Sequence, residues 1–210
     1  MFCASIGLKD FKTTIKTISN YEMAEIRLDI CEFDRRQVKE IFKSHNNLIA
    51  TFRRNDQTNN KYRESILKTA IAYGAKWLDL DLESNDQEFI EEMSDFSKNY
   101  GTKLIISIHN YNETPAFSTI EQFITSAKKY NPELIKTVFF SNSQKDNTTV
   151  LKLYDKYKNI IAFNMGEIGK ITRIKSLELG APFIYVAIDK NTTAPGQLTL
   201  EEIKKYPKPL

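Results

Sequence analysis

A lysine interrupts an apolar segment that is typical of a buried β-strand. Lys136 lies within LIKTVFF, residues 134–140, where all but one of its neighbours are apolar. An ammonium group in such a segment is costly to keep charged unless it is paired, and burial lowers the pKa of lysines in general. An amine that has lost its extra proton can attack a ketone and form a Schiff base. Lys136 is therefore a candidate nucleophile, although lysines more commonly reach solvent from the end of a strand.

A histidine closes a second apolar segment, IISIH at residues 105–109. Imidazole titrates near neutral pH, so His109 could move protons to and from a substrate bound beside Lys136. The two residues together predict covalent amine catalysis on a carbonyl compound. For an isolated histidine the simpler interpretation is a hydrogen-bonded core residue, and only its convergence with other polar residues favours the catalytic role.

Both segments belong to an alternating pattern of strands and amphipathic helices. Strands are predicted at residues 2–6, 23–28, 48–53, 77–82, 103–109, 135–140, 160–164 and 183–188. Helices are predicted at residues 10–19, 34–43, 62–73, 86–99, 119–130, 146–157, 170–179 and 200–206. Eight strand–helix units predict an α/β fold, a single closed (β/α)8 TIM-type barrel that spans residues 1–210 as one domain. An open doubly wound sheet is the alternative, which the lack of a glycine-rich dinucleotide loop weakens.

Charged residues share one face of several predicted strands. In AEIRLD, residues 24–29, the apolar side chains alternate with Glu25, Arg27 and Asp29, which must then point into the barrel. The same spacing occurs in other strands, with the pairs Thr51 and Arg53, Asp79 and Asp81, and Ser107 and His109. Charges crowded inside a barrel are costly unless they bind one another or a polar ligand. The pattern indicates either a structural ion-pair network or a substrate site at the carboxyl ends of the strands.

Composition argues against several classes of function. Of the 210 residues, 41% are hydrophobic and 27% are charged, which is ordinary for a soluble globular protein. The 30 basic and 27 acidic side chains are interspersed, so we expect no nucleic-acid partner. No segment approaches the roughly 20 apolar residues of a membrane span, and the first residues lack the basic start of a signal peptide. Cys3 and Cys31 have no metal-ligand spacing, so we expect two buried thiols in a reducing cytoplasm.

Two further segments could contact a polar or anionic substrate. In TTAPGQ, residues 192–197, Thr193 and Gln197 flank a Pro-Gly turn after the last predicted strand. Arg173 follows the seventh predicted strand and could clamp an anion through its bidentate guanidinium. Taken alone, the segment at residues 192–197 is more commonly a simple turn, and Arg173 is more commonly a surface arginine.

Together these residues resemble the type I 3-dehydroquinate dehydratases of the shikimate pathway, across nearly the whole chain from Cys3 to Gln197. The matching motifs are Glu-x-Arg-x-Asp at 25–29, Thr-Phe-Arg at 51–53, Ser-x-His at 107–109 followed by Thr114-Pro115, Lys136, Met165, Gly169-x-x-x-Arg173 and Ala194-Pro195-Gly196-Gln197. Each motif is short, but their order and spacing make the set quite specific.

The resemblance implies a (β/α)8 lyase, commonly dimeric, that converts 3-dehydroquinate to 3-dehydroshikimate without a metal or organic cofactor. Lys136 would be the Schiff-base lysine and His109 the general acid and base. Substrate binding would fall to Glu25, Arg27 and Arg53 at the ring hydroxyls and to Arg173 at the carboxylate, helped by Gln197 and by Thr193 in place of the usual serine. We therefore expect a cytoplasmic homodimeric enzyme that acts in aromatic amino acid biosynthesis. Its binding partner would be the small-molecule substrate 3-dehydroquinate, and we expect it to bind neither nucleic acid nor a membrane.

Two departures from the family pattern concern the orientation of His109. The family usually carries a glutamate followed by glycines after the third-strand arginine, and that glutamate orients the catalytic histidine. Here residues 54–60 read RNDQTNN, with neither residue type. Asp56, Gln57 or Asp81 could replace the glutamate. Asn110 stands where an aspartate commonly follows the histidine.

Two other functions stay open at the level of the sequence. Another Schiff-base barrel, such as an aldolase, would often need a phosphate site near the seventh and eighth strands. GEIG at residues 166–169 could supply backbone amides, but the acidic Glu167 disfavours an anion there. The other alternative is a catalytically silent barrel that acts as a binding protein. The missing loop glutamate favours it, whereas the presence of both Lys136 and His109 disfavours it.

Overall fold

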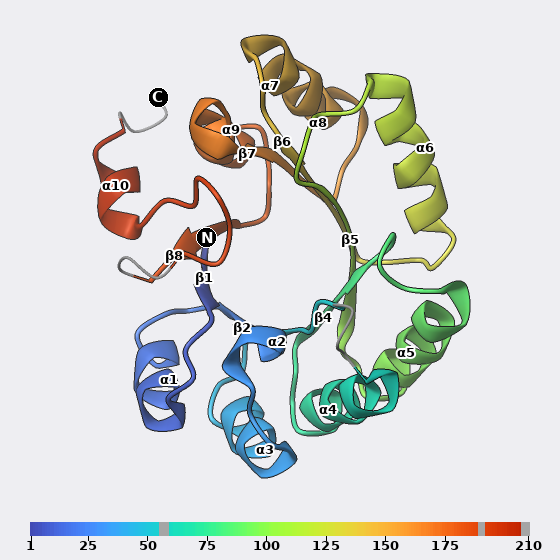
Figure 1. Ribbon diagram of the computed structural model, residues 1–210, viewed down its shortest axis with the longest axis vertical. Coiled ribbons are helices and arrows are strands. Elements are labelled where there is room, and N and C mark those ends of the chain that lie inside the picture. Colours follow the sequence, from blue (N-terminus) through green and yellow to red (C-terminus); the bar gives the residue numbers. More distant parts are fainter. Residues whose placement is uncertain (55–58, 189–191, 207–210) are drawn as a thin grey trace.

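Eight strands form one parallel sheet that curves into a barrel (Figure 1). The computed structural model describes residues 1–54, 59–188 and 192–206. The strands are β1 (Phe2–Ile6), β2 (Ala24–Arg27), β3 (Leu48–Thr51), β4 (Trp77–Asp81), β5 (Lys103–Asn110), β6 (Leu134–Phe140), β7 (Ile160–Met165) and β8 (Ile184–Ala187). Their order in the sheet is β7-β6-β5-β4-β3-β2-β1-β8, and every neighbouring pair is parallel.

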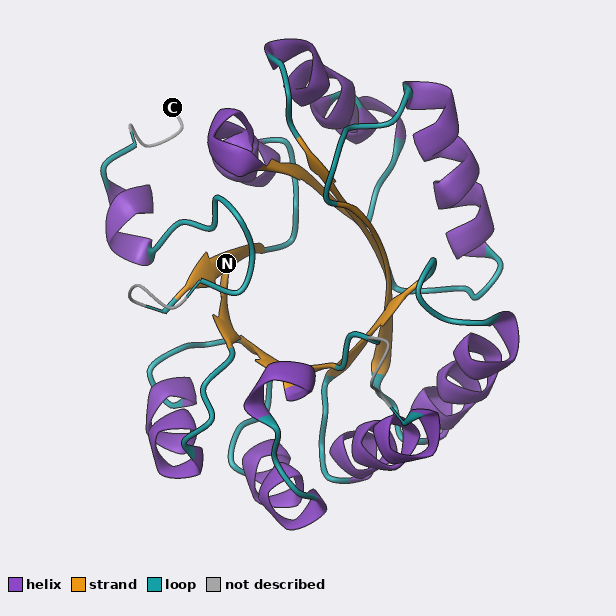
Figure 2. Cartoon of the chain, in the orientation of Figure 1, coloured by secondary structure: helices purple, strands orange, loops and turns teal. Residues whose placement is uncertain are grey.

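Helices surround the ring of strands (Figure 2). They are α1 (Phe11–Ile18), α2 (Leu28–Cys31), α3 (Arg35–Lys43), α4 (Asn60–Ala72), α5 (Gln87–Asn99), α6 (Phe117–Lys128), α7 (Gln144–Leu151), α8 (Leu153–Lys156), α9 (Gly166–Glu178) and α10 (Leu200–Lys204). With helices outside and side chains filling the ring, every residue of β3 and β7 is buried, which explains their nearly continuous apolar sequences. None of the described helices is long and apolar enough to cross a membrane.

The arrangement confirms the predicted (β/α)8 barrel, with one difference at its seam. Among the described strands, β7 and β8 are the two ends of the sheet and share no ladder, so the barrel is nearly closed. The seam is flanked by α9 and by the segment after β8, both of which contribute to the site described below.

Polar caps mark the start of the helices α1, α3, α4 and α5. Asp10, Asp34, Asn59 and Asp86 each accept a hydrogen bond from the backbone amide three residues further along the chain. Such caps satisfy amides that the first helical turn leaves without partners. They let short loops reverse the chain after each strand and keep the carboxyl ends of the strands together.

Two predicted elements are wrong in detail near the carboxyl ends of the strands. Asp29 belongs to the one-turn helix α2 and not to the strand face on which the sequence placed it. Its carboxylate accepts two hydrogen bonds from Arg27, at 3.0 and 2.7 Å, which hold this turn against β2. The helix predicted at 170–179 begins earlier, because Gly166, with φ of +81°, allows the chain to turn from β7 directly into α9.

Candidate active site

The carboxyl ends of the strands surround a pocket of about 440 Å³, a volume that includes space open to solvent. Its lining includes all eight residues that the sequence singled out as site residues: Glu25, Arg27, Arg53, His109, Lys136, Arg173, Thr193 and Gln197. Seven more residues line it that the sequence did not assign to the site: Ser5, Tyr111, Val138, Phe163, Met165, Tyr185 and Ala194. The structure thus brings together side chains that are up to 192 positions apart in the chain, from Ser5 to Gln197.

Lys136 lies in the middle of β6, and its side chain is paired inside the barrel. The residue is only 5% exposed. Its Nζ donates a hydrogen bond to Asp79 Oδ2 at 2.9 Å and lies 4.0 Å from Glu25 Oε1. The side chain is thus paired as well as buried, and the two carboxylates offset the cost of burying an ammonium group.

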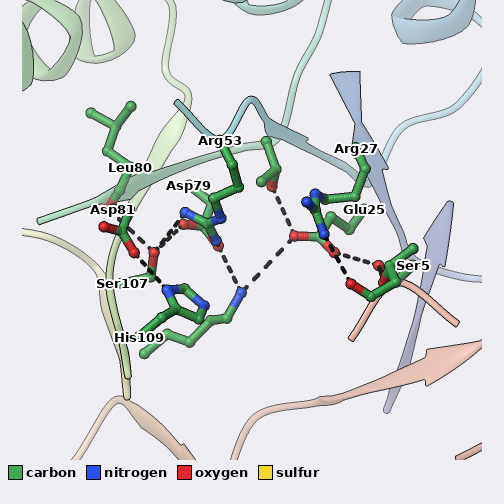
Figure 3. Close-up of polar contacts among 12 residues, drawn as sticks. Ser5, Glu25, Arg27, Arg53, Asp79, Leu80, Asp81, Ser107 and His109 are labelled. Atoms are coloured by element: carbon green, nitrogen blue, oxygen red, sulfur yellow. Dashed lines mark hydrogen bonds and ion pairs between the residues drawn. The ribbon is translucent and has the colours of Figure 1, made fainter. Parts of the chain in front are cut away.

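Asp79 is the acid at the centre of this cluster (Figure 3). Oδ2, which accepts from Lys136, also accepts from Arg53 Nη2 at 2.9 Å, and Oδ1 accepts from Ser107 Oγ at 2.6 Å. Burial opposes ionisation of this carboxyl, but the charges of Arg53 and Lys136 outweigh burial and hold its pKa well below the usual range. Asp79 is thus a fixed anion that positions a lysine and an arginine side by side.

His109 is oriented by a second acid from the same strand. Its Nδ1 donates to Asp81 Oδ2 at 2.6 Å, which leaves Nε2 with the free lone pair (Figure 3). Burial and the charge of Arg53 lower the pKa of His109, although the hydrogen bond to Asp81 opposes this shift. The imidazole is therefore neutral at pH 7 and able to accept a proton.

The same contact bears on which residue orients His109 in the absence of the usual loop glutamate. Of the three candidates from the sequence, Asp81 contacts His109, whereas Asp56 and Gln57 lie outside the described residues. Burial opposes ionisation of Asp81, but the hydrogen bond and charge of His109 and the charge of Arg53 together outweigh burial and keep its pKa well below the usual range. An ionised Asp81 can only accept, so it fixes the hydrogen of His109 on Nδ1.

Glu25 anchors a chain of hydrogen bonds on the opposite side of Lys136. Its two carboxylate oxygens accept from Ser5 Oγ at 2.6 Å and Thr51 Oγ1 at 2.9 Å. Ser5 shares a further hydrogen bond of 2.6 Å with Thr193, whose amide donates to Gln197 Oε1 at 2.9 Å. Ser5 was not among the residues predicted from the sequence, although it is the one polar side chain in the apolar strand FCASI, which is a signal for it.

Two arginines complete the lining. Arg27, bound to Asp29, also donates from Nη1 to the carbonyl of Thr193 at 3.3 Å. Arg173 is in α9, only 2% exposed, and its Nη2 donates to the carbonyl of Pro195 at 3.3 Å. Burial lowers the pKa of the Arg173 guanidinium to about 9, so it stays charged at pH 7. Among the described residues no carboxylate is paired with it, so its charge is available to an anionic group.

A comparison with known families settles what kind of barrel this is. The model of the type I 3-dehydroquinase family matches residues 2–208. The chain belongs to this family. The 3-dehydroquinate dehydratase of Pyrococcus abyssi is 32% identical over 203 residues, which cover 94% of this chain and 91% of that protein. The enzyme of Thermococcus onnurineus is 31% identical, with 98% and 96% covered. As a type I 3-dehydroquinase, the chain is a lyase.

Solved structures agree with the fold of this family. The type I 3-dehydroquinate dehydratase of Clostridium difficile superposes with a TM-score of 0.84 at 24% identity, covering 97% of this chain and 89% of that one. The Aquifex aeolicus 3-dehydroquinate dehydratase gives 0.82 at 23% identity, with 98% and 96% covered. These similarities are to type I 3-dehydroquinase barrels, as the resemblance seen in the sequence implied.

Proposed function

We propose that this chain dehydrates 3-dehydroquinate to 3-dehydroshikimate through a Schiff base on Lys136, with His109 as general base and then general acid. The observation that carries the proposal is that a buried amine and a neutral imidazole line one pocket together with three arginines. A ketone, a proton next to it and an anionic carboxylate are the substrate features that such a set can address.

Binding is assigned by the charge and the partners of each side chain. Arg173, with no acid paired to it among the described residues, would bind the substrate carboxylate, helped by Gln197 and Thr193. Glu25, Arg27 and Arg53 would hold the ring hydroxyls, because each faces the pocket while its neighbours fix its orientation. This orientation places the proton to be removed towards Nε2 of His109.

The first chemical step is attack of Lys136 on the ketone. Nζ must release a proton before it can attack, and the neutral His109 in the same pocket is a base that can take it. The new N–C bond gives a carbinolamine, which loses its oxygen as water to form an iminium. Asp79 and Glu25 stay ionised throughout and stabilise the cation that develops at nitrogen.

Elimination follows from the iminium. The cationic nitrogen draws electrons and acidifies the neighbouring C–H bond, so Nε2 of His109 removes that proton and an enamine forms. The imidazolium then protonates the ring hydroxyl as it leaves, and hydrolysis of the new iminium releases the product and Lys136. Asp81 supports both roles, because it stabilises the imidazolium and keeps Nε2 facing the substrate.

Borohydride trapping tests the proposal directly. We expect incubation with 3-dehydroquinate and sodium borohydride to add one reduced adduct, which peptide mass spectrometry places on Lys136. Turnover is followed by the absorbance of the conjugated product. A panel of sugar phosphates serves as the control, because an aldolase-like barrel would be trapped by those and not by 3-dehydroquinate. A protein that neither reacts nor turns over any of them would be a silent binding barrel, and the proposal would be wrong.

A second prediction concerns the partner of His109. We expect Asp81→Asn to lower kcat/KM at pH 7 by about 10- to 100-fold, because an amide neither stabilises the imidazolium nor fixes the hydrogen on Nδ1. Asp81 raises the pKa of His109, so its loss should move the acid limb of the pH profile to lower pH.

The control for this variant is Glu88→Gln, which removes an exposed carboxylate from α5. It should leave both the rate and the pH profile unchanged. An Asp81→Asn enzyme with the wild-type acid limb would mean that another group orients His109.

Compartment and assembly complete the proposal. The two cysteines, Cys3 and Cys31, are buried and free, which suits a reducing compartment such as the cytoplasm. We propose a homodimer, as the resemblance implies, and sedimentation velocity at micromolar concentration distinguishes it from a monomer.

A further inference from the structure

A tyrosine of β8 stands against the reactive amine. Tyr185 is 4% exposed and lines the same pocket as Lys136. The centre of its ring lies 4.2 Å from Lys136 Nζ, which is close enough for a cation–π contact. The ring is held from behind by Phe183, at 5.5 Å between centroids in an edge-on arrangement.

The hydroxyl of this tyrosine has no partner in the described part of the chain. Its oxygen is buried, and no described residue accepts or donates a hydrogen bond there. A buried hydroxyl without a partner costs free energy, so such groups in a native structure call for an explanation. Tyr154 provides the contrast, because its buried hydroxyl donates to the carbonyl of Ala162 and accepts from the amide of the same residue.

The hydroxyl is suited to donate a hydrogen bond. Burial, with added repulsion from Glu25 and Asp79, raises the pKa of Tyr185 well above its usual value. The group therefore keeps its proton at neutral pH. Three other hydroxyls line the pocket. Those of Ser5 and Thr193 are already bonded to each other, and that of Ser5 also to Glu25, whereas Tyr111 is 58% exposed.

We propose that Tyr185 is a further catalytic residue, whose hydroxyl donates a hydrogen bond to the oxygen on the carbon that Lys136 attacks. The inference rests on the proposed function. A carbonyl carbon poised for attack must lie about 3–3.5 Å from Nζ, which brings its oxygen beside the ring that covers Nζ. Tyr185 thereby gains the partner that the free protein does not supply.

The hydrogen bond acts in the formation of the Schiff base. As the N–C bond forms, the electron pair of the C=O π bond moves to oxygen, and a proton from nitrogen neutralises it to give the carbinolamine hydroxyl. The nitrogen lone pair then forms C=N while the C–O bond breaks, and a second proton, delivered by the imidazolium of His109, lets the oxygen leave as water. Tyr185 donates to this oxygen throughout and keeps its own proton, so it stabilises the developing negative charge.

Tyr185→Phe isolates the hydroxyl, because the ring over Lys136 and its contact with Phe183 stay in place. We expect the rate of imine formation, measured by rapid mixing with 3-dehydroquinate and borohydride quench, to fall about 100-fold, as for the loss of one oxyanion donor. The Tm of the free protein should stay the same or rise, since an unsatisfied buried group has been removed.

Tyr154→Phe is the matched control and should give the opposite pair of results. It removes a buried hydroxyl that the fold itself uses, so Tm should fall by about 2–4 °C. Imine formation should keep the wild-type rate.

Three outcomes would overturn the inference, and they differ from one another. An inactive wild-type protein removes the proposed function and this inference with it. An active wild type with an unchanged imine rate in Tyr185→Phe removes the inference alone. A drop in Tm for Tyr185→Phe equal to that of Tyr154→Phe would show that the fold satisfies the hydroxyl, so that it does not await a substrate.

Discussion

Replacing Lys136 with alanine is expected to abolish turnover of 3-dehydroquinate. Lys136 is the one lysine among the described residues that line the pocket, so kcat/KM should fall by on the order of 10⁶-fold, as when other enzymes lose their covalent nucleophile. The borohydride adduct should vanish as well, which separates loss of the covalent step from a weaker binding of substrate.

The variant should still fold. Asp79 keeps its hydrogen bonds from Arg53 and Ser107 when the ammonium is lost, and Glu25 keeps those from Ser5 and Thr51. Both acids thus escape the full penalty of an unpaired buried charge. Circular dichroism would verify the fold of the variant.

A matched control is Lys103→Ala, which removes an exposed lysine from the neighbouring strand β5. It should leave turnover and trapping intact. If Lys136→Ala turns over substrate at a rate comparable with that of Lys103→Ala, or is trapped on another lysine, the proposed role of Lys136 is wrong.

Replacing His109 with alanine is the second large effect that we expect. Loss of the general base and acid should lower kcat by about 10²- to 10⁴-fold. Lys136 and its partners Asp79 and Glu25 are untouched, and water can replace His109 in the proton transfers of imine formation, so the imine should still form, although more slowly, and accumulate ahead of elimination. Mass spectrometry after borohydride treatment should then find the adduct with the mass of the reduced dehydroquinate imine.

The pH profile gives an independent signature of this variant. The wild-type kcat/KM should rise as pH increases through the pKa of His109, which lies below its ordinary value of about 6.5, because only the neutral imidazole accepts a proton. In His109→Ala this limb should be missing. A variant that retains the limb would show that a different group titrates.

The other histidine serves as the control. His45 lies away from the pocket, with one ring nitrogen near the carbonyl of Tyr21 and the other accepting from the amide of Asn47. His45→Ala should lose some stability and keep both the rate and the acid limb.

The alternation of strands and helices was readable because it depends on local physics. Strands covered on both faces need nearly continuous apolar residues, and helices need one apolar face. Both patterns can therefore be recognised in the sequence. The same reasoning located the inward charges, since neighbouring strand residues point to opposite faces. It failed for Asp29, where the chain leaves the sheet for α2 and the two-residue period no longer applies.

The residues that make up the site could be predicted only in part from the sequence. Lys136, His109 and Arg53 stood out because charged or titratable groups are rare in buried segments. Ser5 and Tyr185 did not stand out, because serine and tyrosine are common in strands. Their place in the site is evident only from the pocket that they line.

By itself the sequence determined the barrel, the inward faces of its strands and the residue types that gather at their carboxyl ends. The pairings depend on the tertiary structure: Asp79 lies with Lys136 and Arg53, and Asp81 with His109. The same holds for the hydroxyl of Tyr185, which has no partner among the described residues. The reason is the distance along the chain over which each feature is determined. Periodicity is set by adjacent residues, whereas a hydrogen bond depends on the register between strands and on ångström distances between side chains far apart in the chain.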